Sequence, residues 1–175
     1  MMTRAILSLI VGGFCFVGFA CSNTPTETAK SSANSSTPAT PAATARPLKA
    51  LTAFNAEWLS QQIPSEMQAG QSYTVTLALK NPTSETWPAG TGPVTVNIAY
   101  HWLPAQGDKP VVFEGQRTPL PHDIPPGESI TLSNVVVLAP PNSGVYRLQM
   151  TLVQETISWF EWQGAKPLTV PVTVR

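Results

Sequence analysis

From residue 51 onward the chain alternates apolar and polar residues in short runs, and proline or glycine bounds each run. The run 73–79 carries its apolar side chains at odd positions, whereas the runs 94–102 and 146–152 carry theirs at even positions. A period of two residues is typical of a strand with one buried face. These three segments therefore predict β-strands and not helices.

Further short strands are predicted from apolar segments between turn residues, at 54–59, 111–114, 130–138, 157–162 and 168–174. Pro171 confines the last of these to a sheet edge or a bulge, because proline has no amide hydrogen to donate to a ladder. The segment 145–163 is the longest one without proline or glycine, and its period of two still predicts strand. Seven or eight short strands separated by turns predict an all-β fold, a single antiparallel β-sandwich.

Residues 1–20 have a different pattern, in which Arg4 precedes a continuous apolar run that ends at Ala20. The run is shorter than the ~20 residues that cross a bilayer, so it predicts a signal peptide and not a transmembrane helix. The following motif Gly18-Phe19-Ala20-Cys21 resembles a bacterial lipobox, in which the cysteine becomes the lipid-modified first residue of the mature chain. Acylation of Cys21 would also explain why an exported protein has no partner for this thiol, since Cys15 lies within the predicted signal peptide.

Residues 22–45 consist almost entirely of Ser, Thr, Pro and Ala, with no aromatic or large aliphatic residue. Such a segment has no apolar surface to bury and is predicted to be disordered. We therefore expect residues 21–50 to be a lipid-anchored linker and residues 51–175 to be one folded domain. Ser22 stands where lipoproteins of the inner membrane commonly have Asp, so the resemblance implies an outer-membrane lipoprotein.

Several residues of the predicted domain resemble those of immunoglobulin-like (Ig-like) sandwiches. Gly144-Val145-Tyr146-Arg147-Leu148 resembles the tyrosine corner, in which the Tyr146 hydroxyl would bond nearby backbone, and Trp102 takes a position similar to the core tryptophan of such folds. Further motifs of the likeness are Asn81-Pro82, Trp87, Pro126-Gly127-Glu128 and Trp159-Phe160. The block resembles Ig-like accessory domains of bacterial envelope proteins and, distantly, the tryptophan-rich Ig-like domain of a eukaryotic autophagy receptor. The resemblance implies a binding or spacing role.

The net charge of the whole chain is zero, because 10 Lys and Arg balance 10 Asp and Glu. The predicted domain alone holds six basic and nine acidic side chains, without a basic cluster. A nucleic-acid binder needs such a cluster to face the phosphates, so we exclude nucleic acid as a partner.

The domain shows no pattern of a catalytic or metal site. A zinc site needs three or four closely spaced ligands, whereas no cysteine remains in the domain and His101 and His122 are far apart in the sequence. We expect His101 to lie on the surface, and His122-Asp123 to form a solvated turn instead of a site with Glu114. No Gly-x-Ser-x-Gly motif occurs, and Glu155 and Glu161 fit surface acids better than the carboxylate pair of a glycosidase. We predict a protein that is not an enzyme and needs no cofactor.

Trp159 and Trp162 are the remaining candidate binding residues. In an extended segment Phe160 and Trp162 share one face and Trp159 lies on the other, so at most one of these faces meets the core. The other would be an aromatic platform for a sugar ring or a partner protein. The favoured alternative is that Trp159 or Trp162 closes the end of the core. We expect Arg117 to be structural and to hold loop carbonyls.

Three functions remain open. The first is a lipid-anchored envelope protein whose domain binds or scaffolds an envelope protein or glycan, with the membrane contacted through the lipid on Cys21. The second is a carbohydrate-binding module that uses Trp159 and Trp162. The third is an Ig-like protease inhibitor that acts through an exposed loop at 104–108.

Overall fold

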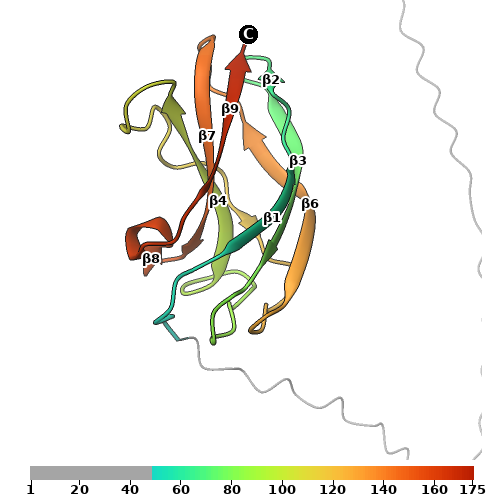
Figure 1. Cartoon of the computed structure of the whole chain (residues 1–175), viewed down its shortest axis with the longest axis vertical. Helices are drawn as coiled ribbons and strands as arrows, with labels where there is room; N and C mark the ends of the chain where they lie inside the picture. The colour runs from blue at the N-terminus through green and yellow to red at the C-terminus, as the bar shows by residue number, and fades with distance from the viewer. Residues whose placement is uncertain (1–48) are drawn as a thin grey trace, which may run out of the picture. The chain divides into compact units, whose positions relative to one another are not determined.

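Two β-sheets pack face to face in the computed structural model, which describes residues 49–175 (Figure 1). The smaller sheet has the strand order β1-β3-β6, with β1 (Glu57–Gln62), β3 (Ser72–Lys80) and β6 (Ser129–Leu138). The larger sheet has the order β2-β9-β7-β4-β5, and β8 pairs with β7. Its strands are β2 (Glu66–Met67), β4 (Val96–Pro104), β5 (Thr118–Pro119), β7 (Gly144–Gln154), β8 (Ser158–Trp159) and β9 (Leu168–Val174).

The prediction of an all-β sandwich is confirmed. The described residues form nine strands, three of them only two residues long, and one 3₁₀-helix, η1 (Glu161–Gln163). The predicted signal peptide, Cys21 and nearly all of the predicted linker lie outside the described residues.

The predicted alternation places the core between the two sheets. On β3 the buried residues are every second one from Val75 onward, whereas β7 is buried at Leu148 and at every residue from Met150 to Gln154. The core residues of these two strands are Val75, Leu77, Leu79, Leu148, Met150 and Leu152. Each strand pairs with an antiparallel neighbour, β3 with β6 and β7 with β4, so apolar side chains of adjacent strands lie together on the inner faces.

Strand β6 changes the phase of its alternation halfway along. Leu132 pairs with Leu77 and Val135 pairs with Val75, so β6 contains one residue more than β3 between these pairs. An extra residue of this kind is a β-bulge, and it lets both halves of the strand turn apolar side chains to the same core. The bulge explains why the segment 130–138 is apolar without simple alternation.

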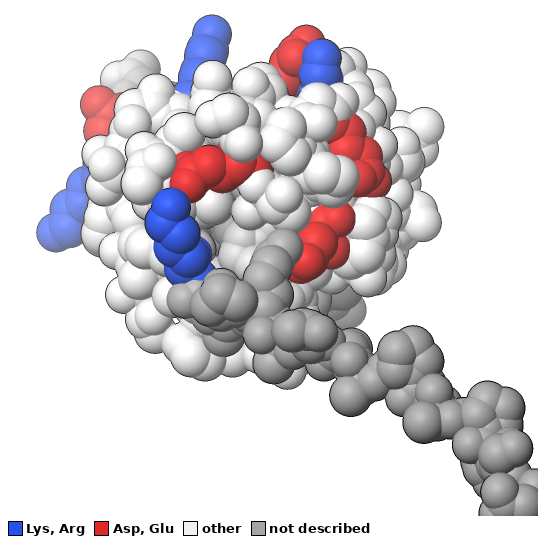
Figure 2. Space-filling view, turned by 90° about the horizontal axis from the view of Figure 1, so that it is seen from below, with Lys and Arg blue, Asp and Glu red and all other residues white. Residues whose placement is uncertain are grey.

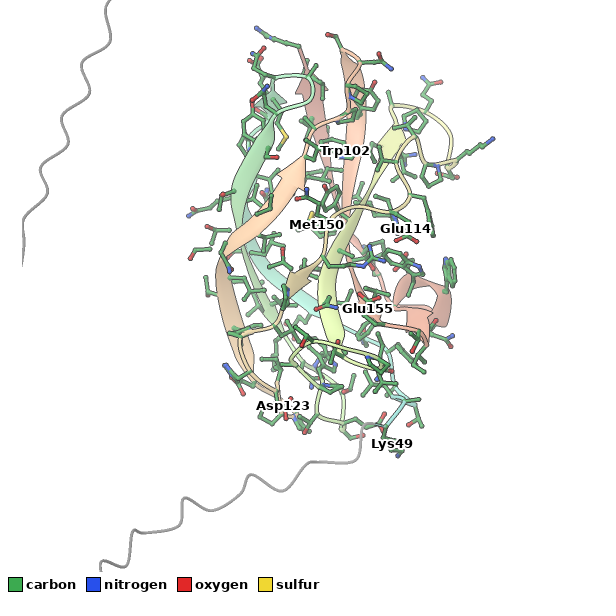
Figure 3. All side chains as sticks on the ribbon, turned by 180° about the vertical axis from the view of Figure 1, so that it is seen from behind. Lys49, Trp102, Glu114, Asp123, Met150 and Glu155 are labelled. Carbon is green, nitrogen blue, oxygen red and sulfur yellow. The ribbon has the colours of Figure 1, made fainter. Side chains whose placement is uncertain are left out.

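Side chains of the larger sheet cover the outer edge of β6. The Leu138 amide donates to the Tyr100 hydroxyl oxygen at 2.9 Å, and the Trp102 indole nitrogen donates to the Leu138 carbonyl oxygen at 2.9 Å. Unpaired edge groups would otherwise be open to another strand. Trp102 is completely buried and links the two sheets, in the upper half of the view in Figure 3.

Aromatic residues close the end of the sandwich near Lys49. Phe160 packs edge-to-face on Phe54 and on Trp87, with ring centroids 5.2 Å and 5.8 Å apart. At the same end the Gln154 side chain accepts a hydrogen bond from the Leu51 amide at 2.9 Å, which attaches the start of the described chain to β7. Phe160, and neither Trp159 nor Trp162, is therefore the side chain that closes this end of the core.

The position of Pro171 agrees with the prediction of an edge site. Beyond it, the amides of Thr173 and Arg175 donate to the Ser65 and Met67 carbonyl oxygens, both at 2.9 Å. By alternation the nitrogen of Pro171 points to the same side of β9, past the end of β2. Because β2 does not extend to this position, the missing amide hydrogen of Pro171 leaves no hydrogen bond of the sheet unmade.

Charged groups are sparse on the end of the domain seen in Figure 2, where acidic and basic side chains are scattered over a mostly uncharged surface. This agrees with a charged fraction of 11% for the whole chain. Among residues 49–175, no helix is long and apolar enough to cross a membrane.

Candidate binding site on the outer face of the larger sheet

Strand β4 is buried on both faces, although its alternation predicted one polar, exposed face. Asn97, Ala99 and His101 point away from the smaller sheet, and none of them is more than 7% exposed. Ala99 forms a second, small apolar cluster with Val153 and Trp159. The prediction that His101 lies on the surface is wrong, because the period of a strand does not reveal which distant segments fold over its polar face.

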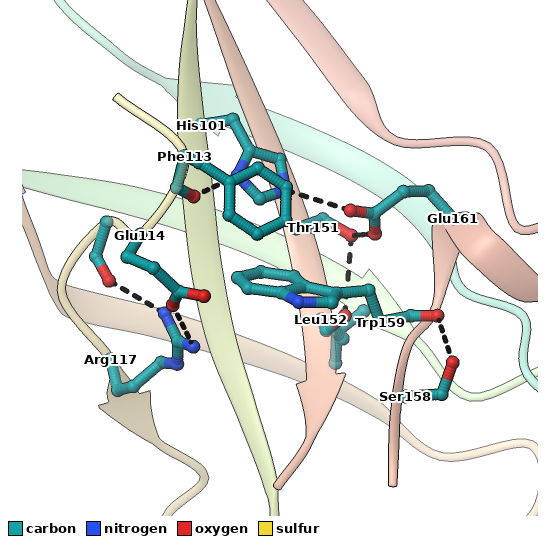
Figure 4. Close-up of polar contacts among 10 residues, drawn as sticks. His101, Phe113, Glu114, Arg117, Thr151, Leu152, Ser158, Trp159 and Glu161 are labelled. Atoms are coloured by element: carbon teal, nitrogen blue, oxygen red, sulfur yellow. Dashed lines mark hydrogen bonds and ion pairs between the residues drawn. The ribbon is translucent and has the colours of Figure 1, made fainter. Parts of the chain in front are cut away.

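His101 lies at the centre of this outer layer and joins the two segments that cover it (Figure 4). Its Nδ1 donates to the Phe113 carbonyl oxygen, and its Nε2 lies 2.8 Å from Oε1 of Glu161. The imidazole ring also stacks on the Phe113 ring, with centroids 4.6 Å apart and an interplanar angle of 12°. A carbonyl oxygen can only accept, so Nδ1 carries the hydrogen of the bond to Phe113.

Glu161 is held by two hydrogen bonds inside this layer. Besides the contact with His101, its Oε2 accepts a hydrogen bond from the Thr151 hydroxyl. Burial raises the pKa of Glu161, but the hydrogen bonds from His101 and Thr151 outweigh burial and hold the pKa below the ordinary value of 4.5. The carboxylate is thus charged at neutral pH and fastens η1 to β4 and β7.

The segment 111–117 lies along β4 beyond the short strand β5. The Trp102 amide donates to the Val112 carbonyl oxygen at 2.8 Å, and the Gly115 amide donates to the Tyr100 carbonyl oxygen at 3.0 Å. A Cβ atom on Gly115 would lie 2.4 Å from that Tyr100 oxygen, so the close approach requires glycine. In place of the strand predicted at 111–114, the structure has an irregular segment with a single bridge from Val112 to Trp102.

Arg117 connects segment 111–117 to Glu155, the residue after β7, and to the ring of Trp159. Its Nη1 donates to the Gly115 carbonyl oxygen at 2.8 Å, as expected of a guanidinium that holds loop carbonyls. It also pairs with Glu114 at 2.6 Å and with Glu155 at 3.1 Å, and its guanidinium carbon lies 4.6 Å from the centroid of the Trp159 ring. These ion pairs and the cation–π contact were not predicted.

A depression of about 240 Å³ opens beside these groups. Glu114, Arg117 and Glu155 form its polar wall, and the indoles of Trp159 and Trp162 border it. Glu114 and Glu155 lie on the side of the molecule away from β3 and β6 (Figure 3).

One residue that lines the depression has a strained backbone. This residue, Thr156, has a φ of 62°, a left-handed conformation that is uncommon for a β-branched residue. Such strain often accompanies ligand sites, because the surrounding structure must hold the residue in place.

The two tryptophans predicted as a platform have different environments. Phe160 has helical backbone angles, φ −64° and ψ −39°, and leads directly into η1, so the segment 157–162 is not extended as predicted. Trp159 is buried beneath Arg117, whereas Trp162 is 64% exposed. Trp162 stacks on Phe113 instead, with centroids 6.0 Å apart and an interplanar angle of 17°.

The sequence did not indicate that Phe113 is part of the aromatic surface. It lies far along the chain from Trp162 in a segment without regular alternation, and only the folding of segment 111–117 over β4 brings the rings together. The two residues before it, Val111 and Val112, are apolar, so the segment 111–114 predicted a short strand and not a stacking position.

Other predicted residues lie elsewhere. The Tyr146 hydroxyl donates to the Asn142 carbonyl oxygen at 3.0 Å, so it bonds nearby backbone as expected. His122 pairs with Glu128 at 2.7 Å on the surface. Asp123 lies near the lower end of the domain in Figure 3, away from Glu114, which lies at about mid-height. Residues 49–175 contain no group of three or more side chains suited to hold a metal ion.

The loop 104–108 is held by Arg147 of β7. The guanidinium donates to the Pro104 carbonyl oxygen at 3.2 Å, to the Gly107 carbonyl oxygen, and to Asp108 at 3.2 Å. The loop is exposed, as its prediction as an inhibitory loop requires, and the function of the loop stays a prediction.

Comparison with known proteins identifies no family. No family model matches the sequence, and no curated protein matches it. Among solved structures, the chain is similar to a mutant (D270A) β-glucosidase from Listeria innocua in complex with laminaribiose, with 15% sequence identity and a TM-score of 0.38. The β-glucosidase from Listeria innocua in complex with gluconolactone has 14% identity and a TM-score of 0.36. Each match covers 69% of this chain and 16% of the glucosidase chain.

Proposed function

We propose that this protein is a non-catalytic binding protein of the cell envelope, anchored in the outer membrane by a lipid on Cys21. Its Ig-like domain binds a partner through the outer face of the larger sheet. The observation that carries this proposal is the exposed indole of Trp162, which stacks on Phe113 at the rim of a depression with charged walls. Exposed aromatic side chains beside polar groups are typical of binding surfaces.

The carboxylates of this face support binding rather than hydrolysis. A glycosidase needs one carboxylic acid whose pKa is raised, so that it can protonate the leaving group. The pKa of Glu161 is lowered instead, and its oxygens are engaged by His101 and Thr151. Glu155 is ion-paired with Arg117. Both carboxylates are therefore held in place by contacts within the face.

A second depression, of about 450 Å³, lies between β1 and β9 and offers less for recognition. Trp58 lines it, but the Trp58 indole nitrogen already donates to the Lys166 carbonyl oxygen at 3.1 Å. Its other lining residues are Ala56, Lys166, Pro167, Leu168 and Thr169, without the paired acids and guanidinium of the outer face. We therefore place the binding function at Trp162.

The test uses the full chain expressed in a Gram-negative host. Wild-type protein should sediment with membranes, and Cys21→Ser should appear in the soluble fraction, because that variant cannot be acylated. Purified wild-type protein in detergent should bind isolated envelopes, and Trp162→Ala should lower the affinity about tenfold, equal to about 1.4 kcal/mol of lost contact.

Leu59→Ala is the matched control for this binding assay. Leu59 is an exposed apolar residue on β1 of the smaller sheet, so its removal should leave envelope binding unchanged. Equal binding by Trp162→Ala and wild type would refute the binding face. Retention of Cys21→Ser in the membrane fraction would refute the lipid anchor.

A further inference from the structure

The exposed surface of Trp162 is flat and supported from one side. The indole lies nearly parallel to the Phe113 ring, and Phe113 is in turn stacked on the buried ring of His101. His101 bonds the backbone of Phe113 and the side chain of Glu161, the residue before Trp162. The same buried histidine thus positions both aromatic residues, so little ordering entropy remains to be lost when a ligand stacks on them.

The polar wall beside this surface offers acceptors and donors together. Glu114 and Glu155 contribute carboxylate oxygens, and Arg117 contributes N–H groups, while their mutual ion pairs keep the three side chains in place. A hydroxyl group donates and accepts hydrogen bonds, so it can bond to both kinds of group. A ligand with several hydroxyls and one apolar face matches this arrangement of wall and platform.

Asn97 of β4 supports the wall from beneath. It donates from Nδ2 to Oε1 of Glu155 at 2.9 Å and so helps to hold this carboxylate in place. Asn97 itself does not line the depression, and its Oδ1 is buried, so it takes no part in the ligand contacts.

Charge and volume narrow the class of ligand. Two carboxylates face one guanidinium, so the wall is acidic and disfavours an anionic ligand. The volume of about 240 Å³ lies below the roughly 300–1,000 Å³ of pockets for drug-sized ligands. The depression suits one small polar ring.

We infer that the site binds a neutral sugar ring of an envelope glycan, with one face of the ring on Trp162 and its hydroxyls bonded to Glu114, Arg117 and Glu155. This inference rests on the proposed function and names its ligand class. The C–H face of a pyranose ring supplies the apolar contact with Trp162, and the hydroxyl groups form hydrogen bonds with the charged side chains of the wall.

The experiment is a competition assay on the full chain in detergent, bound to isolated envelopes. Three competitors are prepared from the same envelopes: a protease-digested neutral glycan fraction, an anionic glycan fraction separated by ion exchange, and a deglycosylated protein fraction. The neutral fraction should displace the Trp162-dependent binding. The Glu155→Gln variant should lower the affinity for the neutral fraction about fivefold to tenfold, since a charged acceptor is lost while the shape is kept.

The outcomes separate the ligand class from the binding function. Failure of the neutral fraction to displace wild-type protein, or displacement by the anionic or protein fraction alone, overturns the sugar ligand and leaves the binding face intact. Envelope binding that is equal for wild type and Trp162→Ala overturns both. Circular dichroism of Glu155→Gln controls for folding, and Leu59→Ala again serves as the variant with unchanged binding.

Discussion

The two faces of β4 are equally buried but are built in different ways. The inner face carries Ile98, Tyr100 and Trp102, which pack against the smaller sheet. The outer face carries Asn97, Ala99 and His101, which are covered by segment 111–117, β8 and η1 through hydrogen bonds, ion pairs and ring stacking. A polar face of a strand can therefore belong to the interior.

The difference in chemistry implies a difference in role. Burial of large apolar side chains on the inner face contributes stability in proportion to area. Burial of the His101–Glu161 pair contributes little net stability, since desolvation offsets the attraction, but breaking the pair leaves a polar group unpaired. We conclude that the inner face stabilises the domain and the outer face positions Trp162 and Phe113.

The strongest way to test this comparison is to remove the inner tryptophan. Trp102→Ala should lower the free energy of unfolding by about 3–5 kcal/mol, because it leaves a cavity and removes the bond to Leu138. Urea unfolding followed by far-UV circular dichroism measures the loss. A loss below about 1 kcal/mol would show that the inner face does not carry the stability.

Gly115→Ala tests how tightly segment 111–117 lies on β4. The added methyl group meets the Tyr100 backbone oxygen and ring, so the free energy of unfolding should fall by about 1–3 kcal/mol. Gly144→Ala is the matched control, since its added Cβ would lie 3.2 Å from the nearest atom of the Tyr146 side chain, a milder contact. Equal losses for the two variants in urea unfolding would contradict the close approach at Gly115.

The outer pair should show a dependence on pH. The folded-state pKa of Glu161 is lowered, so the unfolded chain binds more protons there, and the stabilisation is present above about pH 4.5 and is lost as pH falls through the folded pKa. Glu161→Gln should cost about 1–2 kcal/mol at pH 7 and progressively less below pH 4.5. Urea unfolding of both proteins between pH 3 and pH 7 measures this difference, and a constant difference across that range would argue against the charged pair.

The smallest effect on stability is expected for the residue with the largest effect on binding. Trp162→Ala should change the free energy of unfolding by no more than about 0.5 kcal/mol, because the side chain is mostly exposed. A thermal or urea unfolding curve checks this. A loss comparable to that of Trp102→Ala would place Trp162 among the structural residues and not among the binding residues.

Several elements could be predicted residue by residue. The strand β3 and its buried residues followed from the alternation, as did the inward positions Leu148, Met150 and Leu152 of β7. The edge position of Pro171 followed from its missing amide hydrogen. The burial of Trp102 followed from its place at the end of an apolar stripe. In each case the information lies within one short segment.

The site was predicted only in part. Trp162 is exposed as a platform requires, but Trp159 is buried, and Phe113 takes the place beside Trp162. The extended geometry assumed for 157–162 failed at Phe160, where the chain turns into η1. A turn of three residues has no periodic pattern to reveal it, because a period needs several repeats to be visible.

The sequence by itself determined the longer strands β3, β4, β6, β7 and β9 and which of their sides meets the main core, since side-chain direction in a strand depends only on local backbone geometry. Only the tertiary structure decided that a second layer covers the outer face of β4. That layer joins Phe113, His101 and Glu161 from three separate segments, and their bonds exist only once the chain has brought those segments together. The surface around Trp162, at which we propose binding, is a product of that assembly.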